Sequence, residues 1–159
     1  MSKLNLNLEK DLRGKNIIVT GASRGLGAKT CELLALKGAN IAMLARSLKD
    51  MRKLKNKIKN SKKHICIKVD FEENDQIEAA IKEAQKFLKK IDIVIHIAGG
   101  GYGLSDPLIN NNDINKLLQI NLLAAMEINR IVVNTKKKNK TLKLIHVGSI
   151  SSYEATGSV

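Results

Sequence analysis

The sequence predicts an α/β fold built on a doubly wound parallel sheet with five strands in the order 3-2-1-4-5. Two features of the 159 residues support this prediction. Short runs rich in Ile, Val, Leu and Ala alternate with longer segments of helical periodicity, which is the pattern of strands joined by crossover helices. In addition, no part of the chain contains strands only or helices only, as an antiparallel or all-helical domain would.

Five apolar runs are the candidate strands. They cover residues 16–20, 40–45, 64–69, 91–97 and 142–147. Because these runs are nearly continuous, the strands are expected to be covered by other elements on both faces of the sheet. The fifth strand is expected to lie at an edge and to expose apolar surface.

Four segments of helical periodicity are the candidate helices. They cover residues 26–37, 47–60, 74–90 and 112–136. The first carries its apolar residues at Leu26, Thr30, Leu33 and Leu34, and it is expected to end at Gly38 because glycine favours the left-handed conformation that terminates helices. The second is amphipathic, and its outer face is basic.

The third and fourth candidate helices carry further signals. Asp75 and Glu78 stand at the spacing of a capping box near the start of the third helix. The fourth has apolar side chains on more than one side, so part of it is expected to face another subunit. No linker, internal repeat or low-complexity segment divides the chain, which predicts a single domain over residues 1–159.

Composition narrows the classes of function. Lys plus Arg number 28 against 15 for Asp plus Glu, a net charge of +13, so the basic surface is either a solvated face or a surface for anionic partners. No aromatic residues alternate with the lysines, so we do not expect nucleic acid as a partner. No apolar run approaches the roughly 20 residues of a membrane span, which favours a cytoplasmic protein.

The two cysteines suggest neither a disulfide nor a metal site. Cys31 and Cys66 lie within apolar stretches and show no spacing typical of metal ligands. We expect buried, reduced thiols and no bound metal.

A glycine-rich segment, Thr20-Gly21-Ala22-Ser23-Arg24-Gly25-Leu26-Gly27, joins the first strand to the first helix. This context is typical of a Rossmann-type phosphate loop. Gly21 would allow the tight turn, Gly25 the passage of backbone close to a pyrophosphate, and Gly27 the close packing of helix on strand. The N–H groups and dipole at the helix N-terminus would attract the phosphates. The alternative is a glycine turn that serves structure alone.

The end of the second strand indicates which dinucleotide would bind. In such folds an acidic residue roughly 20 residues after the loop bonds the adenosine ribose of NAD. Here the position reads Ala45-Arg46. Arg46, with Arg24 of the loop, could pair with a 2′-phosphate, so we expect NADP(H) as cofactor. The alternative is that Arg46 is a solvent-facing cap of the next helix.

With these landmarks in order, the sequence from Asp11 onward resembles the short-chain dehydrogenase/reductase family, and most closely its 3-oxoacyl-[acyl-carrier-protein] reductases. The resemblance implies that Asp70 contacts the adenine ring with the help of the adjacent Phe71 backbone. Taken alone, Asp70 could also be an acid at the start of a helix. It further implies that Ala98 and Gly99 let the cofactor ribose approach the backbone.

One segment departs from the family pattern. His96-Ile97-Ala98-Gly99 stands where the family usually has Asn-Asn-Ala-Gly. The hydrogen bonds that the second asparagine normally makes across the sheet must therefore be lost or replaced. We interpret His96 as a structural residue because it occupies a supporting position.

Two residues match the catalytic pattern of the family. Asn121 corresponds to an asparagine that holds a water in a proton relay through a kink in the helix backbone, and Ser149 to the serine that hydrogen-bonds the substrate carbonyl or hydroxyl. A serine-rich turn without a role is the alternative for Ser149. The family also uses a Tyr-x-x-x-Lys pair, and Tyr153 does not begin one because Gly157 stands in the lysine position.

The resemblance therefore implies an NADP(H)-dependent reductase that converts a carbonyl to a hydroxyl, on a small or acyl-carrier-bound substrate such as a 3-oxoacyl thioester in fatty acid biosynthesis. We expect a chain truncated before the catalytic pair, a fragment without turnover, and a dimeric or tetrameric parent. The alternatives are a sugar or alcohol dehydrogenase of the same family, and a non-catalytic nucleotide-binding module.

Overall fold

The computed structural model describes residues 12–104, 108–136 and 141–149. Its sheet contains five strands, all parallel, in the order β3-β2-β1-β4-β5, which confirms the predicted fold class and strand order. The strands are β1 (Asn16–Thr20), β2 (Asn40–Ala45), β3 (His64–Lys68), β4 (Ile93–His96) and β5 (Lys143–His146). Tyr153, discussed above, lies outside the described residues.

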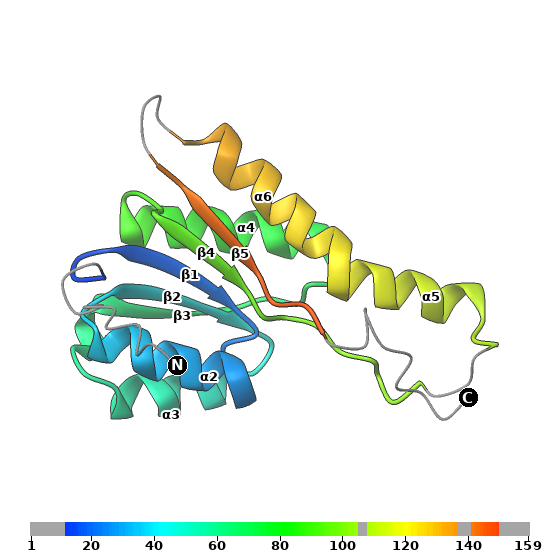
Figure 1. The fold of residues 1–159 in the computed structure, drawn as a ribbon, viewed down its shortest axis with the longest axis horizontal. Coiled ribbons are helices and arrows are strands. Elements are labelled where there is room, and N and C mark those ends of the chain that lie inside the picture. Colours follow the sequence, from blue (N-terminus) through cyan, green and yellow to red (C-terminus); the bar gives the residue numbers. More distant parts are fainter. Residues whose placement is uncertain (1–11, 105–107, 137–140, 150–159) are drawn as a thin grey trace, which may run out of the picture.

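Helices cover both faces of the sheet (Figure 1). The helices are α2 (Gly25–Leu36), α3 (Leu48–Lys57), α4 (Asn74–Leu88), α5 (Asn111–Leu118) and α6 (Ala124–Asn134), with a short 3-10 turn, η1 (Ser61–Lys63). α2 and α3 pack on one face, and α4 and α6 on the other, while α5 projects beyond the sheet (Figure 1).

Alternate residues of the central strand point to opposite faces of the sheet and contribute to two separate cores. Ile17 and Val19 of β1 belong to the core under α2 and α3, and Ile18 belongs to the core under α4 and α6. All five residues of β1 are buried, so the expectation of a strand covered on both faces is correct for the sheet centre. The four residues of β5 are exposed, as expected for a strand at the edge of the described sheet.

The buried face of α2 differs from the apolar pattern in the sequence. Leu26 and Leu33 are exposed, whereas Cys31 and Ala35 are buried with Leu34. Small residues bring the helix axis close to the sheet, so the helix turns this face inward. Gly38 has φ +88° and follows the helix end, as expected.

Three other expectations need correction, in whole or in part. No capping box forms at α4, because its N-cap is Glu73 and no side chain caps it. The predicted helix over 112–136 is divided into α5, a π-helical turn η2 (Gln119–Leu123), and α6, and the turn lies where the resemblance implied a backbone kink, at Asn121. Cys31 is buried as expected, but Cys66 is partly exposed.

Candidate nucleotide-binding and catalytic site

A cleft of about 830 Å³ opens where the carboxyl ends of the strands meet the helix N-termini. This is the place where open parallel sheets bind ligands. Its walls come from the segments that follow all five strands, including twelve predicted site residues: Gly21, Ser23, Arg24, Gly25, Leu26, Gly27, Arg46, Phe71, Ala98, Gly99, Asn121 and Ser149. The fold thus brings most of the predicted site together.

The glycine loop is shaped by two close backbone approaches. A Cβ atom on Gly27 would overlap the carbonyl oxygen of Gly21, and one on Gly21 would lie 2.8 Å from the Ala98 nitrogen. Gly21 also has φ +68° and Gly25 has φ +52°, a region that side chains disfavour. A side chain at these positions would therefore cause steric overlap or backbone strain.

The start of α2 presents unpaired donors to the cleft. The first intrahelical bond runs from the Ala28 nitrogen to the Arg24 oxygen, so the preceding N–H groups of the first turn have no helical partner. Arg24 is the N-cap residue, and its side chain does not cap the helix. Phosphate oxygens are suitable acceptors for such N–H groups, so the loop fits a dinucleotide pyrophosphate.

Arg46 lies at the cleft wall and is exposed. It does not cap the following helix, because Ser47 is the N-cap of α3 and its Oγ accepts a hydrogen bond from the Asp50 nitrogen at 3.3 Å. Of the alternative considered for Arg46, a solvent-facing cap, the exposure is observed and the capping is not. Within the described part of the chain, no ion pair engages the guanidinium of Arg24 or Arg46.

Two predicted residues do not line the cleft. Ala22 is fully buried beneath the loop, where its nitrogen donates to the Leu44 oxygen at 3.2 Å. Asp70 closes a local turn, because its Oδ1 accepts a hydrogen bond from the Glu72 nitrogen at 3.1 Å. Since α4 begins later, at Asn74, the alternative role of Asp70 as an acid at the start of a helix is wrong, while its contact with adenine stays a prediction. Phe71 lines the cleft next to it.

The hydroxyl of Thr20 replaces the bracing that an asparagine at position 97 would give. Its Oγ1 accepts hydrogen bonds from the nitrogens of Ile97 and Ala98, both at 3.1 Å. These bonds tie the end of β4 to the end of β1. The departure from the Asn-Asn-Ala-Gly pattern is therefore compensated within the sheet.

Asn121 lies in the π-helical turn, at the cleft wall. Its Oδ1 accepts from the Gly100 nitrogen at 2.9 Å, and its Nδ2 donates to the oxygens of Gly100 at 3.0 Å and Leu117 at 2.9 Å. A Cβ on Gly99 would lie 2.7 Å from Asn121 Oδ1, so glycine is required for this contact. The side chain fixes the segment after β4.

Ser149 also lines the cleft, together with Val147 and Gly148. The segment begins directly after β5, and the Val147 nitrogen donates to the His96 oxygen at 3.0 Å. The predicted catalytic residues Asn121 and Ser149 therefore share one cleft with the glycine loop.

His96 is a buried, neutral residue. Its Nε2 lies 2.9 Å from Asn129 Oδ1, and its ring stacks on that of His146 with 4.4 Å between centroids. Burial lowers the pKa of His96 to about 4. The side chain does not line the cleft, which supports its interpretation as structural.

The sequence analysis missed several residues. Asp50 lines the cleft, and its Oδ2 accepts from Ser47 Oγ at 2.6 Å; the spacing Ser47-x-x-Asp50 is a capping-box pattern that could have revealed it. Tyr102 Oη donates to Glu72 Oε1 at 2.6 Å and ties the segment after β4 to that after β3. No sequence pattern signals this contact.

The described ranges contain neither a cluster of metal ligands nor a helix that could span a membrane. Residues 12–104, 108–136 and 141–149 hold no group of three or more His, Cys, Asp or Glu side chains able to bind a metal ion. Over the same ranges, no helix has both the length and the apolar character to cross a bilayer.

Comparisons with known proteins agree with this geometry. The family model described as "short chain dehydrogenase" matches residues 15–158. Ketoacyl reductase HetN of Nostoc sp. is 29% identical over 141 residues, which cover 88% of this chain and 49% of that protein. The 3-ketodihydrosphingosine reductase of Mus musculus is 29% identical over 144 residues, covering 87% and 43%. The chain thus spans about half the length of these relatives.

Solved structures share the fold. A short-chain dehydrogenase/reductase of Caenorhabditis elegans, crystallised with cofactor, superposes with a TM-score of 0.81 at 26% identity, covering 89% of this chain and 55% of that one. The 3-ketoacyl-(acyl-carrier-protein) reductase of Brucella melitensis complexed with NADH gives 0.79 at 19% identity, covering 89% and 59%.

Replacing Gly27 with alanine tests the packing of the loop. The added methyl would overlap the Gly21 carbonyl, so we expect a loss of about 1–3 kcal/mol in the free energy of unfolding from overpacking. Urea denaturation measures this loss. Gly101→Ala is the control, because no atom lies within 4 Å of its added Cβ. Equal stability of the two variants would contradict the close approach.

Titration tests the burial of His96. The unfolded chain protonates this imidazole near pH 6.5, whereas the folded chain does so only near pH 4. The free energy of unfolding should therefore fall as pH drops from 6.5 to 4, by up to about 3 kcal/mol. Burial also lowers the pKa of His64, which acts in the same direction.

The variant His96→Gln separates the contributions of His96 and His64 to the pH dependence of stability. Denaturation curves at several pH values should show a shallower decline for this variant, since only the His64 contribution is left. An unchanged slope would show that His96 titrates normally.

Proposed function

Because this chain belongs to the short-chain dehydrogenase family, we propose that the protein is an NADP(H)-dependent oxidoreductase that reduces a carbonyl group to a hydroxyl. The observation that carries the proposal is the cleft, where the start of α2, two guanidinium groups and the residues Asn121 and Ser149 converge. A module that only sensed nucleotide would not need Asn121 and Ser149 beside that loop.

The choice of NADP(H) rests on charge. Arg46 follows β2 directly at the cleft wall, where an acidic residue would favour NAD(H), and Arg24 lies on the glycine loop nearby in the same cleft. A 2′-phosphate accepts charge-assisted hydrogen bonds from guanidinium groups. Asp50 also lines the cleft, but its carboxylate already accepts the Ser47 hydroxyl.

In the proposed reaction, bound NADPH supplies a hydride to the carbonyl carbon. Ser149 would donate a hydrogen bond to the carbonyl oxygen and orient it. The main role of Asn121 would be to hold Gly99 and Gly100 against the cofactor ribose. Its role in a proton relay through a water stays a prediction. The resemblance implies that a Tyr-x-x-x-Lys pair donates the proton that the carbonyl oxygen gains. The described residues contain no such pair.

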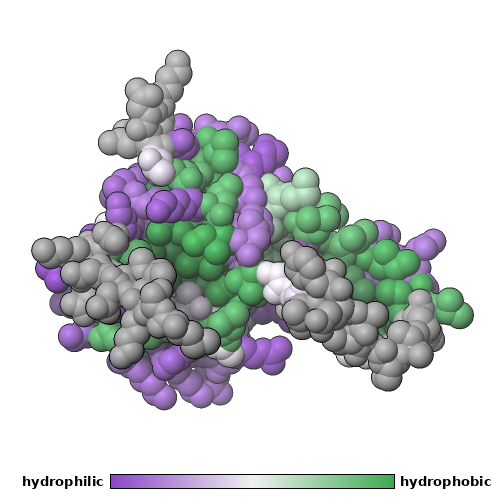
Figure 2. Space-filling model, viewed as in Figure 1, coloured by the Kyte–Doolittle hydropathy of each residue, from purple (hydrophilic) through white to green (hydrophobic). Residues whose placement is uncertain are grey.

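For the substrate, we propose a 3-oxoacyl thioester or a similar 3-oxo compound. The matched relatives named above reduce ketoacyl or ketosphingoid compounds, according to their names. The basic outer face of α3 would suit an acidic acyl carrier. We also propose that the protein forms a homo-oligomer through α5 and α6, since apolar side chains there are exposed, including Leu118, Leu122 and Met126 (Figure 2).

The cofactor proposal predicts a preference for NADPH that depends on Arg46. In the whole natural protein, Arg46→Ala should weaken NADPH binding about 10- to 100-fold, because it removes one or two hydrogen bonds between charged groups. The affinity for NADH should stay nearly unchanged. Fluorescence titration measures both affinities. Arg52→Ala is the matched control, because Arg52 is an exposed arginine of α3 outside the cleft. Tighter binding of NADH by the unaltered protein would refute the NADP(H) assignment.

The substrate proposal predicts oxidation of NADPH by 3-oxo thioesters. The whole natural protein should turn over acetoacetyl thioesters faster than sugars or simple ketones, and absorbance at the nicotinamide band follows the reaction. Faster turnover of sugars or alcohols would assign the protein to another activity of the family. Binding of NADPH without turnover of any carbonyl would favour the non-catalytic module.

A further inference from the structure

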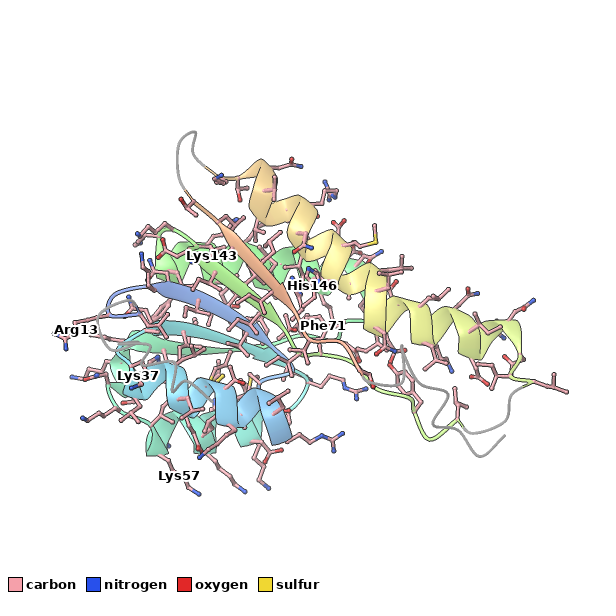
Figure 3. The ribbon with its side chains drawn as sticks, viewed as in Figure 1. Arg13, Lys37, Lys57, Phe71, Lys143 and His146 are labelled. Carbon is pink, nitrogen blue, oxygen red and sulfur yellow. The ribbon has the colours of Figure 1, made fainter. Side chains whose placement is uncertain are left out.

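Three side chains form a hydrogen-bonded bridge behind the cleft. His96 at the end of β4 and His146 at the end of β5 face each other in the strand register. Asn129 of α6 contacts both rings: its Oδ1 is 2.9 Å from His96 Nε2, and its Nδ2 is 3.2 Å from His146 Nε2. The two rings are stacked, with an interplanar angle of 21°. Figure 3 shows His146 between β5 and α6.

The bridge fixes the protons on both rings. An amide oxygen only accepts, so His96 must carry its proton on Nε2. An amide nitrogen only donates, so His146 Nε2 must present a lone pair, and the proton of the neutral ring is on Nδ1. The two histidines are therefore opposite tautomers, and the amide of Asn129 sets this difference.

The bridge joins the three segments that build the proposed catalytic site. His96 leads through Ile97 and Ala98 to Gly99, and His146 is three residues before Ser149. Asn129 stands eight residues after Asn121, in the helix that continues from the π-helical turn. Each member of the bridge is thus connected covalently, over a short distance, to a different wall of the cleft.

β5 has four residues and pairs with β4 alone among the described strands. Beyond the backbone ladder, the side-chain bridge links this strand to both β4 and α6.

We propose that Asn129 is a positioning residue: by bridging His96 and His146 it holds the Ser149 segment in place beside the Gly99 segment, at the ends of the adjacent strands β5 and β4. The consequence for turnover rests on the proposed function. The bridge itself does not, because it can be observed without cofactor or substrate.

Imidazole nitrogen NMR tests the bridge. In the whole natural protein, at about pH 8, where a free imidazole is neutral, His96 should be the Nε2–H tautomer and His146 the Nδ1–H tautomer. Asn129→Asp replaces the donating nitrogen with an accepting oxygen, so His146 should change to the Nε2–H tautomer. If His146 keeps Nδ1–H in Asn129→Asp, Asn129 does not set its proton and the proposal is overturned.

Asn129→Ala tests the positioning. The backbone amide signals of Gly148 and Ser149 should shift, and kcat should fall about 10- to 100-fold, the effect of a small misplacement of a reacting group. The KM for NADPH should change less than about twofold, because the glycine loop and Arg46 are untouched. Asn134→Ala, at the exposed end of α6, is the matched control and should change neither property.

The aspartate variant distinguishes positioning from simple packing. Asn129→Asp keeps an acceptor for His96 and gains one for His146, so it should recover most of the kcat lost in Asn129→Ala. Equal losses in both variants would overturn the proposal. If the protein binds no nucleotide, the proposed function fails, while the tautomer and amide measurements still decide whether the bridge exists.

Discussion

The contact between the start of α2 and the end of β1 is the constraint on which the cleft depends. Gly27 lies so close to the Gly21 carbonyl that no side chain fits between them, and Gly21 in turn lies against the Ala98 backbone. Because β1 is the central strand, this contact aims the helix N-terminus at the middle of the sheet edge. The unpaired N–H groups of the first turn therefore face the same space as the segments after β2, β4 and β5.

Polar side chains hold the segments beyond the strand ends, where no backbone ladder continues. Thr20 ties β1 to the segment after β4, Asn121 holds Gly100, and Tyr102 reaches Glu72. These bonds show how the chain tolerates His96-Ile97 where its family usually has two asparagines. The support for Ala98 and Gly99 comes from other elements, so the backbone keeps a shape that can admit a ribose.

The positive charge of the chain is spread over two different surfaces. Arg24 and Arg46 line the cleft, and both side chains are exposed there. The lysines of α3 lie on its outer face, in water, where each contributes little to stability. A net charge of +13 by itself therefore says little about the ligand; the position of two arginines says more.

The sequence by itself determined the five strands, their parallel order and the glycine loop, because each depends on short-range periodicity or on glycine geometry within a few residues. The tertiary structure decided which face of α2 is buried, the turn that engages Asp70, and the bridge of Asn129. The hydrogen bonds of the tertiary structure join residues far apart in the chain. Thr20 and Ala98 are separated by 78 positions, and His96 and Asn129 by 33. Local patterns carry no information about such contacts, since packing of whole elements brings them together.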